Sequence, residues 1–394
     1  MPEIAQPNRS APARLPGTDK GDRKQQTLRD RWLDWRDRLI ANSRFQRWAA
    51  AFPLTRPIAQ RRATALFDLC AGFVYSQILL SCVQLKLFER LAGDPQTPAQ
   101  LAPRLSLTEQ QAHRLLEAAV ALHLLQRRSG GRYGLGPHGA ALLGNGGVAE
   151  MVAHHALLYR DLADPLALLR GEAGETLLQG FWSYARSPAP AEAAPAGVAG
   201  YSDLMSASQA MIAEELLEAY ALADCRCLMD VGGGQGTFLL AAAQRWPNLQ
   251  LRLFDLPAVA KRAETVFARA GLNERATAVG GDFHCDPLPQ GADIVSLVRI
   301  VHDHDDEAAL ALLAAVRTAL PRGGRLLLAE PMSGTPGAEA AGAAYFGFYL
   351  LAMGSGRPRT PAELRALLAA AGYRRSRLMT TRQPLLLRLI VAEA

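Results

Sequence analysis

The stretch RIVHDHDDE, residues 299–307, places two histidines two positions apart among four acidic residues. On a continuous strand, His302 and His304 would point to one face and could share a metal ion. If the strand instead ends near His302, only that side chain faces a cleft, and the later acidic residues begin a helix, where carboxylates suit the helix dipole. Glu307 follows Asp306 where a metallohydrolase motif would carry another histidine. We therefore predict one catalytic base and no metal site.

A glycine-rich turn is the second candidate for chemistry. MDVGGGQGTF, residues 229–238, follows a strand pattern and opens a helical one. Gly232, Gly234 and Gly236 permit a tight turn and a close approach of the backbone to a ligand. Thr237 does not fit the dinucleotide fingerprint, and the chain has no nucleoside-triphosphate loop of the form GxxxxGK[ST].

Two further strand ends carry suitable side chains. Asp255, in LFDLP, lies about twenty residues after the glycines, where a carboxylate can accept both hydroxyls of a ribose. GGDF, residues 280–283, places Asp282 and Phe283 at the end of the next strand, where they can bind and cover an adenine ring. Each alone would match an ordinary turn, but three successive strand ends together predict a nucleoside site.

The elements that must position these residues follow from periodicity. After Cys227, short Leu-rich or β-branched runs alternate with helical stretches, and the last two runs have no helix between them. This pattern predicts an α/β fold, a Rossmann-like sheet that is mostly parallel and ends in an antiparallel hairpin. Residues 97–136 have a winged helix-turn-helix outline, and the second helix, 108–119, is nearly neutral. A DNA-reading helix should be basic, so we interpret the outline as a structural or dimerising module.

The 394 residues are enough for two domains, each with its own core. We expect a disordered tail over 1–27, a basic, Trp-rich helical arm over 28–62, a helical winged-helix-like dimerisation domain over 63–200, and the cofactor-binding domain over 201–394. The apolar run 69–83 falls short of the roughly 20 residues of a membrane-spanning helix, and we expect it to be buried or at an interface.

The expected tail and arm together carry the net positive charge of the chain. Residues 1–62 have a net charge of +8 against +6 for the whole, and they include Trp32, Trp35 and Trp48. Such a composition suits either a helix lying on an anionic membrane or an arm that packs on a partner subunit, and both interpretations stay open. No secretory signal is visible and the five cysteines suggest reduced thiols, so we expect a cytoplasmic protein. If the arm lies on a membrane, we expect the protein to be peripheral on its inner face. We expect no nucleic-acid partner.

The motifs DVGGGQG, FDLP, GGDF, RIVHDHDDE and LLLAEP, in this order, resemble those of S-adenosylmethionine-dependent O-methyltransferases of the caffeate and acetylserotonin type. The resemblance covers nearly the whole chain after residue 60. It implies S-adenosylmethionine as cofactor, a Rossmann-like domain, a helical dimerisation domain and a homodimer.

The resemblance also assigns roles to individual residues. It implies that Gly232 and Gly234 face the methionine part of the cofactor, Asp255 its ribose, and Gly281, Asp282 and Phe283 its adenine. It places Arg299 at the cofactor, His302 as general base, and Glu330 as the carboxylate that orients His302. It implies an acceptor pocket lined by Met205, Tyr345, Phe346 and Met353.

Two positions depart from the family pattern. His304 stands where relatives have tryptophan, and Pro358 stands where they have a second glutamate that supports the histidine. The orientation of His302 should therefore rely on Glu330 or on another group.

The region 44–91 resembles, more closely, the carotenoid hydroxyl methyltransferases of purple phototrophic bacteria. This implies a lipophilic acceptor, the 1-hydroxyl of an acyclic carotenoid of the demethylspheroidene or hydroxyneurosporene type. The alternatives are a small phenol or polyketide acceptor, a non-catalytic relative that only binds the cofactor, and a winged-helix regulator.

Overall fold

The computed structural model of the chain describes residues 27–181 and 209–394. It divides at Ser76 and Gln77 into two compact units, whose relative placement is not determined. The expected tail 1–27, except its last residue, and the expected domain boundary at 200/201 lie outside the described residues. The two units are therefore described separately.

The first unit is helical. It contains α1 (Leu28–Ala41), α2 (Ser43–Ala51) and the larger part of α3 (Arg56–Gln84). Thr27 caps α1 with a reciprocal bond to Asp30, and the Asn42 side chain caps α2. Such caps satisfy backbone N–H groups that have no partner within the helix.

The helix α3 runs without a break through the boundary that the sequence suggested at 62/63. With 29 residues it is longer than its apolar run, and by length and composition it is the one helix among the described residues that could cross a membrane. Its C-terminal end, with Leu80 and Cys82, is buried in the second unit. Core helices of water-soluble proteins can have the same length and apolar composition.

The second unit begins with the winged helix-turn-helix that the sequence predicted. Thr97 and Thr108 each form a capping box at the start of α5 and α6. The hairpin β1–β2 turns through Gly130 and Gly131, which both have positive φ. The elements of this part are α4 (Leu87–Arg90), α5 (Pro98–Leu105), α6 (Glu109–Ala121), β1 (Leu125–Arg128), η2 (Ser129–Gly131), β2 (Arg132–Leu135), α7 (Pro137–Leu143), α8 (Gly146–Asp161), α9 (Pro165–Arg170) and α10 (Leu177–Phe181).

After a helix over 209–219, the chain builds the mostly parallel sheet that the sequence predicted. Its strand order in the described residues is β5-β4-β3-β6-β7-β9-β8, and β9 runs antiparallel to both β7 and β8. The strands are β3 (Cys227–Val231), β4 (Gln250–Asp255), β5 (Ala276–Gly280), β6 (Ile294–Val298), β7 (Arg325–Glu330), β8 (Arg375–Met379) and β9 (Arg388–Glu393). The helices between them are α13 (Thr237–Arg245), α14 (Pro257–Arg269), η4 (Val301–Asp303), α15 (Asp306–Ala319), η5 (Ala340–Phe346), α16 (Gly347–Met353) and α17 (Pro361–Ala370).

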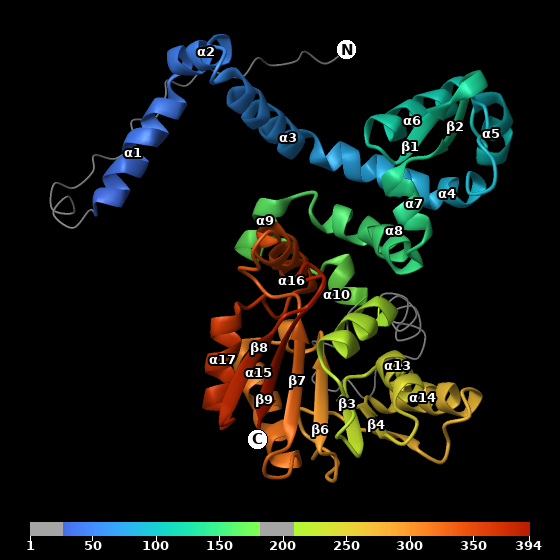
Figure 1. The fold of residues 1–394 in the computed structure, drawn as a ribbon, viewed down its shortest axis with the longest axis vertical. Coiled ribbons are helices and arrows are strands. Elements are labelled where there is room, and N and C mark those ends of the chain that lie inside the picture. The colour runs from blue at the N-terminus through green and yellow to red at the C-terminus, as the bar shows by residue number, and fades with distance from the viewer. Residues whose placement is uncertain (1–26, 182–208) are drawn as a thin grey trace. The chain divides into compact units, whose positions relative to one another are not determined.

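Helices cover both faces of this sheet (Figure 1). Alternate residues of β3 point to opposite faces of the sheet. Leu228 packs in the cluster with α13 and α14, whereas Met229 packs in the cluster with α15 and α17. The carboxyl ends of the parallel strands meet at one edge, where ligands bind in open α/β sheets. All the motifs of the sequence analysis that end a strand therefore lie at this edge.

Candidate active site

The glycine turn after β3 has open space beside its central residue, Gly234. Gly232, Gly234 and Gly236 all have positive φ, which L side chains rarely adopt. A Cβ on Gly236 would lie 2.5 Å from Phe267, and one on Gly232 would lie 2.6 Å from Ile300. A Cβ on Gly234 would meet nothing within 4 Å. The turn is thus packed from behind at its two ends and open at its centre.

A buried carboxylate closes the turn from β4. Asp255 accepts hydrogen bonds from the N–H of Gly234 at 2.8 Å and from its neighbour Leu256 at 2.7 Å. Burial raises the pKa of Asp255 to about 6, although both N–H donors oppose the shift. No lysine or arginine forms a salt bridge with Asp255 in the described part of the chain, so it keeps acceptor capacity for a ligand that donates hydrogen bonds.

Asp230, the last but one residue of β3, lies beneath the same turn. It accepts a hydrogen bond from the Ser296 hydroxyl at 2.6 Å and is 2% exposed. Burial raises its pKa to about 7, with a further contribution from the charge of Asp255. Asp230 stands within the motif MDVGGGQGTF, but no role was predicted for it.

The third strand end carries a cluster of rings. The Asp282 carboxylate accepts from the N–H of His284 at 2.9 Å. The ring of Phe283 lies 4.6 Å from His284 and 5.4 Å from His304, centroid to centroid. His304, which stands where relatives have tryptophan, thus lies within this cluster of rings, and burial lowers its pKa to about 4.

Strand β6 ends at Val298, earlier than the sequence suggested. Arg299 then adopts a positive φ of 59° and turns the chain into the short 3-10 helix η4. A non-glycine residue in this region is strained by about 1–3 kcal/mol, which the surrounding structure must offset. His302 and His304 therefore do not share a strand face. Asp305 is the N-cap of α15.

His302 is 7% exposed and contacts a carboxylate through each ring nitrogen. Its Nδ1 is hydrogen-bonded to Glu330, and its Nε2 lies 3.0 Å from Asp303. Glu330 also accepts from the N–H of Val301 at 2.8 Å, so it fixes both the ring and the backbone of the turn. Burial opposes the charge on His302, but Asp303 and Glu330 outweigh it and raise its pKa to about 10.

A cavity of about 280 Å³ opens beside this histidine. Two predicted residues of the acceptor pocket, Tyr345 and Phe346, line it together with Arg299, His302 and Asp303. Both aromatic residues come from η5, a π-helix, a form that is frequent at functional sites. The remaining wall is largely apolar and comprises Gly147, Val148, Met151, His155, Met211, Ile212, Ala341, Tyr349, Leu385 and Leu386.

Of the two methionines predicted for this pocket, Met353 does not line the cavity. Met353 is fully buried with Leu158, Leu168 and Leu178, where it fills the core beneath α16. Met205 lies outside the described residues. Met211, from the helix over 209–219, lines the cavity instead.

Helix α8 contributes two histidines that the sequence analysis missed. His155 is hydrogen-bonded to the hydroxyl of Tyr345 at 2.5 Å, and His154 to that of Tyr349 at 2.8 Å. Burial lowers the pKa of His154 to about 4 and also lowers that of His155. The two adjacent histidines are visible in the sequence, but the tyrosines that they contact lie about 190 residues later in the chain.

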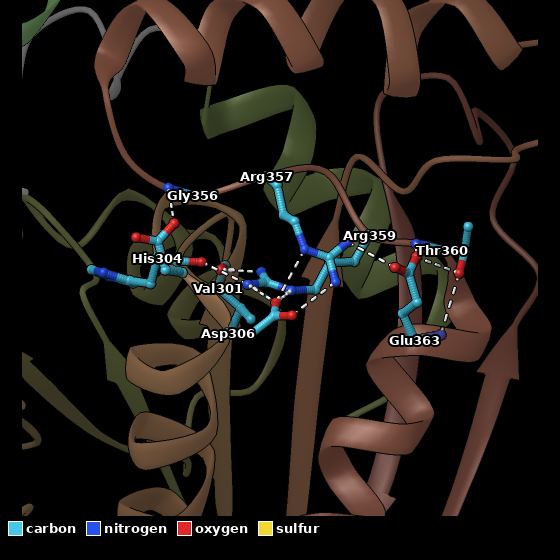
Figure 2. A network of polar contacts seen from close by, with 9 residues as sticks. Val301, His304, Asp306, Gly356, Arg357, Arg359, Thr360 and Glu363 are labelled. Carbon is cyan, nitrogen blue, oxygen red and sulfur yellow. Dashed lines mark hydrogen bonds and ion pairs between the residues drawn. The ribbon is translucent and has the colours of Figure 1, made fainter. Parts of the chain in front are cut away.

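Segment 355–359 lies against the turn that carries His302. Figure 2 shows Arg357 and Arg359 converging on the carboxylate of Asp306. Pro358, which replaces the family's second glutamate, lies between these two arginines in the sequence. The second carboxylate on His302 is instead Asp303, the adjacent residue. No role was predicted for Asp303, which precedes the acidic residues of the predicted helix start.

Within the described residues, no group of three or more His, Cys, Asp and Glu side chains is arranged to hold a metal ion.

Comparisons with known proteins agree with these features. Residues 159–374 match the O-methyltransferase domain family, and residues 67–145 match the O-methyltransferase dimerisation domain family. Demethylspheroidene O-methyltransferase of Cereibacter sphaeroides is 45% identical over 336 residues, which cover 85% of this chain and 88% of that protein. The protein of the same name from Rhodobacter capsulatus is 41% identical over 357 residues, covering 90% of this chain and 88% of that one.

Solved structures share the fold. The structure of human N-acetylserotonin methyltransferase in complex with SAM superposes with a TM-score of 0.70 at 22% identity, covering 84% of this chain and 97% of that one.

Proposed function

Because the chain belongs to the O-methyltransferase family, whose members use S-adenosylmethionine, we propose that it methylates the 1-hydroxyl of an acyclic carotenoid with His302 as the base. The observation that carries the choice of acceptor is the 45% and 41% identity to two demethylspheroidene O-methyltransferases over most of both chains. The position of His302 at an apolar cavity supports the proposal.

The strand ends fit this cofactor. The open space at Gly234 allows the backbone to approach a ligand, and Asp255 offers a buried carboxylate to ribose hydroxyls. Asp282 and Phe283 offer an acceptor and a ring for adenine. When bound there, S-adenosylmethionine supplies an activated methyl group on a positively charged sulfonium.

His302 must lose its proton before it can take one from the acceptor. With its pKa raised to about 10, the imidazole is protonated near pH 7 in the absence of ligands. The sulfonium of bound S-adenosylmethionine would bring a second positive charge into the same cleft. Such a charge lowers the pKa of His302 and favours its neutral form. Once neutral, His302 keeps its Nδ1–H on Glu330 and can accept the hydroxyl proton at Nε2, where the acceptor hydroxyl takes the place of Asp303. The two nearby carboxylates then stabilise the charge that forms on the ring.

The cavity suits one end of a long acceptor. Its volume of about 280 Å³ is at the lower limit of the roughly 300–1,000 Å³ of small-molecule sites. A long acyclic carotenoid therefore places only its hydroxylated end in the cavity. Leu385, one of the wall residues, is 55% exposed, which gives the remaining chain an apolar path outwards.

The acceptor is tested with purified protein and S-adenosylmethionine labelled in its methyl group. We compare 1-hydroxyneurosporene with a simple phenol, both supplied in detergent. The proposal expects the label in the carotenoid at a kcat/KM at least tenfold above that for the phenol. Methylation of the phenol alone would overturn the acceptor, and binding of the cofactor without methylation of either would favour the non-catalytic alternative.

We also propose that the protein is a homodimer. The match to the dimerisation domain family supports this assembly. Helix α3 carries large apolar side chains that are exposed in the single chain, including Phe67, Leu69 and Phe73, which are 64%, 81% and 72% exposed. Multi-angle light scattering of the purified protein should give twice the mass of one chain, and a monomer at micromolar concentration would contradict the proposal.

We propose, third, that the first unit contacts an anionic membrane from the cytoplasmic side. Leu28, Trp32, Trp35 and Leu39 recur with helical spacing along α1, and the two tryptophans are 55% and 59% exposed. Arg36 lies over the ring of Trp32 at 5.6 Å. Exposed tryptophans among arginines are typical of helices at the surface of anionic membranes. Such contact would bring the enzyme to an acceptor that dissolves in lipid.

Vesicle flotation tests the membrane contact. Wild-type protein should float with vesicles that contain phosphatidylglycerol, less with pure phosphatidylcholine, and less at high salt. The double variant Trp32→Ser, Trp35→Ser should lose this binding and keep its activity on acceptor in detergent. Trp246→Ser, in the second unit, is the control. Unchanged flotation of the double variant would contradict the proposal, and a change of its mass to that of a monomer would favour the partner-subunit interpretation.

A further inference from the structure

The turn that carries His302 has four consecutive carbonyl groups, on residues 301–304, and within the turn only that of Val301 has a donor, the N–H of His304 at 3.3 Å. All four receive one from a single segment about fifty residues later in the chain. Arg359 donates to the carbonyls of Val301 at 2.8 Å and His304 at 2.7 Å. The N–H of Arg357 donates to His302 at 3.0 Å, and the Ser355 hydroxyl donates to Asp303 at 3.0 Å.

Arg359 is the only side chain that holds both ends of this turn, within the residues that the structure describes. It is 2% exposed, and its Nε also donates to Asp306 at 2.8 Å, at the start of α15 (Figure 2). One planar guanidinium thus ties η4 to the helix that follows. Without Arg359 the buried carbonyl of His304 would lose its donor, which costs about 1–3 kcal/mol. The carbonyl of Val301 would keep only the longer bond from the N–H of His304, so the turn should move.

We propose that Arg359 is a positioning residue for the catalytic base. It fixes the backbone on both sides of His302, so the imidazole stays between Glu330 and Asp303. It does not touch the ring and takes no part in proton transfer. The proposal rests on His302 being the base.

Arg357 provides a control of equal charge. It also binds Asp306, at 3.0 Å, but its side chain is 43% exposed and its second partner is Glu363 on α17. Its side chain does not reach the carbonyls of the turn, and its N–H bond to His302 belongs to the backbone. Arg357→Met therefore removes a cation beside the same carboxylate and leaves all four carbonyl bonds in place.

The first measurement is steady-state kinetics of Arg359→Met, Arg359→Lys and Arg357→Met, with 1-hydroxyneurosporene or with the phenol if that is the better acceptor. We expect at least a tenfold loss of kcat for Arg359→Met, a smaller loss for Arg359→Lys, and less than a twofold loss for Arg357→Met. The affinity for S-adenosylmethionine should stay within twofold in all three. Should Arg359→Met fail to fold, Arg359→Lys keeps the charge and most of the buried stem.

The second measurement is the pKa of His302 in the cofactor-free proteins, from NMR titration of labelled histidine assigned with His302→Ala. Removal of a nearby cation alone would raise this pKa. Movement of the ring away from its carboxylates would lower it, and this lowering is what we expect for Arg359→Met and not for Arg357→Met.

The two hypotheses fail in different ways. If His302→Ala remains as active as wild type, the base itself is wrong. If His302→Ala is inactive but Arg359→Met matches Arg357→Met in both kcat and the pKa of His302, the base stands and the positioning role of Arg359 is wrong.

Discussion

The glycine turn and the turn that carries His302 are both tight turns at the same edge of the sheet, but they are held differently. The glycine turn is held by its own backbone and by Asp255 on the next strand, about twenty residues away. The turn of His302 is held by Glu330 and by segment 355–359. The cofactor side is thus encoded locally, whereas the acceptor side is assembled from distant parts of the chain.

This difference predicts that damage to one turn leaves the other functional. The largest effect should come from His302→Ala. A general base contributes about 10²–10⁴-fold to rate, so kcat should fall by that factor. The affinity for S-adenosylmethionine, measured by calorimetry, should stay within twofold of wild type. A parallel loss of affinity would mean that the two turns are not independent.

The next effect concerns Gly356. It has a φ of 77°, and a Cβ there would lie 2.1 Å from the carbonyl oxygen of His302. Gly356→Ala should push the turn away and lower kcat by about tenfold or more, again with little change in cofactor affinity. Gly334→Ala is the control, because its φ of 66° imposes similar strain while its nearest atom is 3.7 Å away. Equal kinetics for both variants would contradict the role of Gly356.

On the cofactor side, the affinity for S-adenosylmethionine should depend on the protonation of Asp255. Burial raises its pKa to about 6, so the carboxylate that we assign to the ribose hydroxyls is present above that pH and is lost below it. The association constant should fall by up to about tenfold per pH unit below pH 6. Asp255→Ala should bind weakly at every pH and lose this dependence, and a pH-independent wild type would exclude the assigned role.

The smallest effect is expected from the open centre of the glycine turn. Gly234→Ala places a methyl group in free space at a φ of 60°, so it should weaken cofactor binding a few-fold and cost about 1–2 kcal/mol of stability. Gly236→Ala, whose Cβ would lie 2.5 Å from Phe267, should destabilise the fold more. Thermal unfolding and calorimetry of both variants separate these contributions.

The same comparison explains what the sequence could predict. The strands, the antiparallel hairpin and the winged helix follow from local periodicity, and the strand-end residues Asp255 and Asp282 follow from motif spacing. Asp303 stands within the motif RIVHDHDDE and Arg359 follows Pro358, but their roles depend on where two loops meet. The pairing of His155 with Tyr345 joins α8 to η5 across the fold, and no local pattern encodes it. Met353 was misplaced because its helix presents that side chain to the core.

The most direct test of His302 as a base held by two carboxylates is the pH dependence of kcat/KM for S-adenosylmethionine, at saturating acceptor, in wild type and Asp303→Asn. The charge of Asp303 helps to raise the pKa of His302 to about 10. The imidazolium form is inactive, so wild-type kcat/KM should rise with pH towards that value. In Asp303→Asn the rise should shift to lower pH, because one of the two charges that favour the imidazolium is gone. A wild-type profile that is flat from pH 7 to pH 10, or one that Asp303→Asn leaves unchanged, would contradict the account.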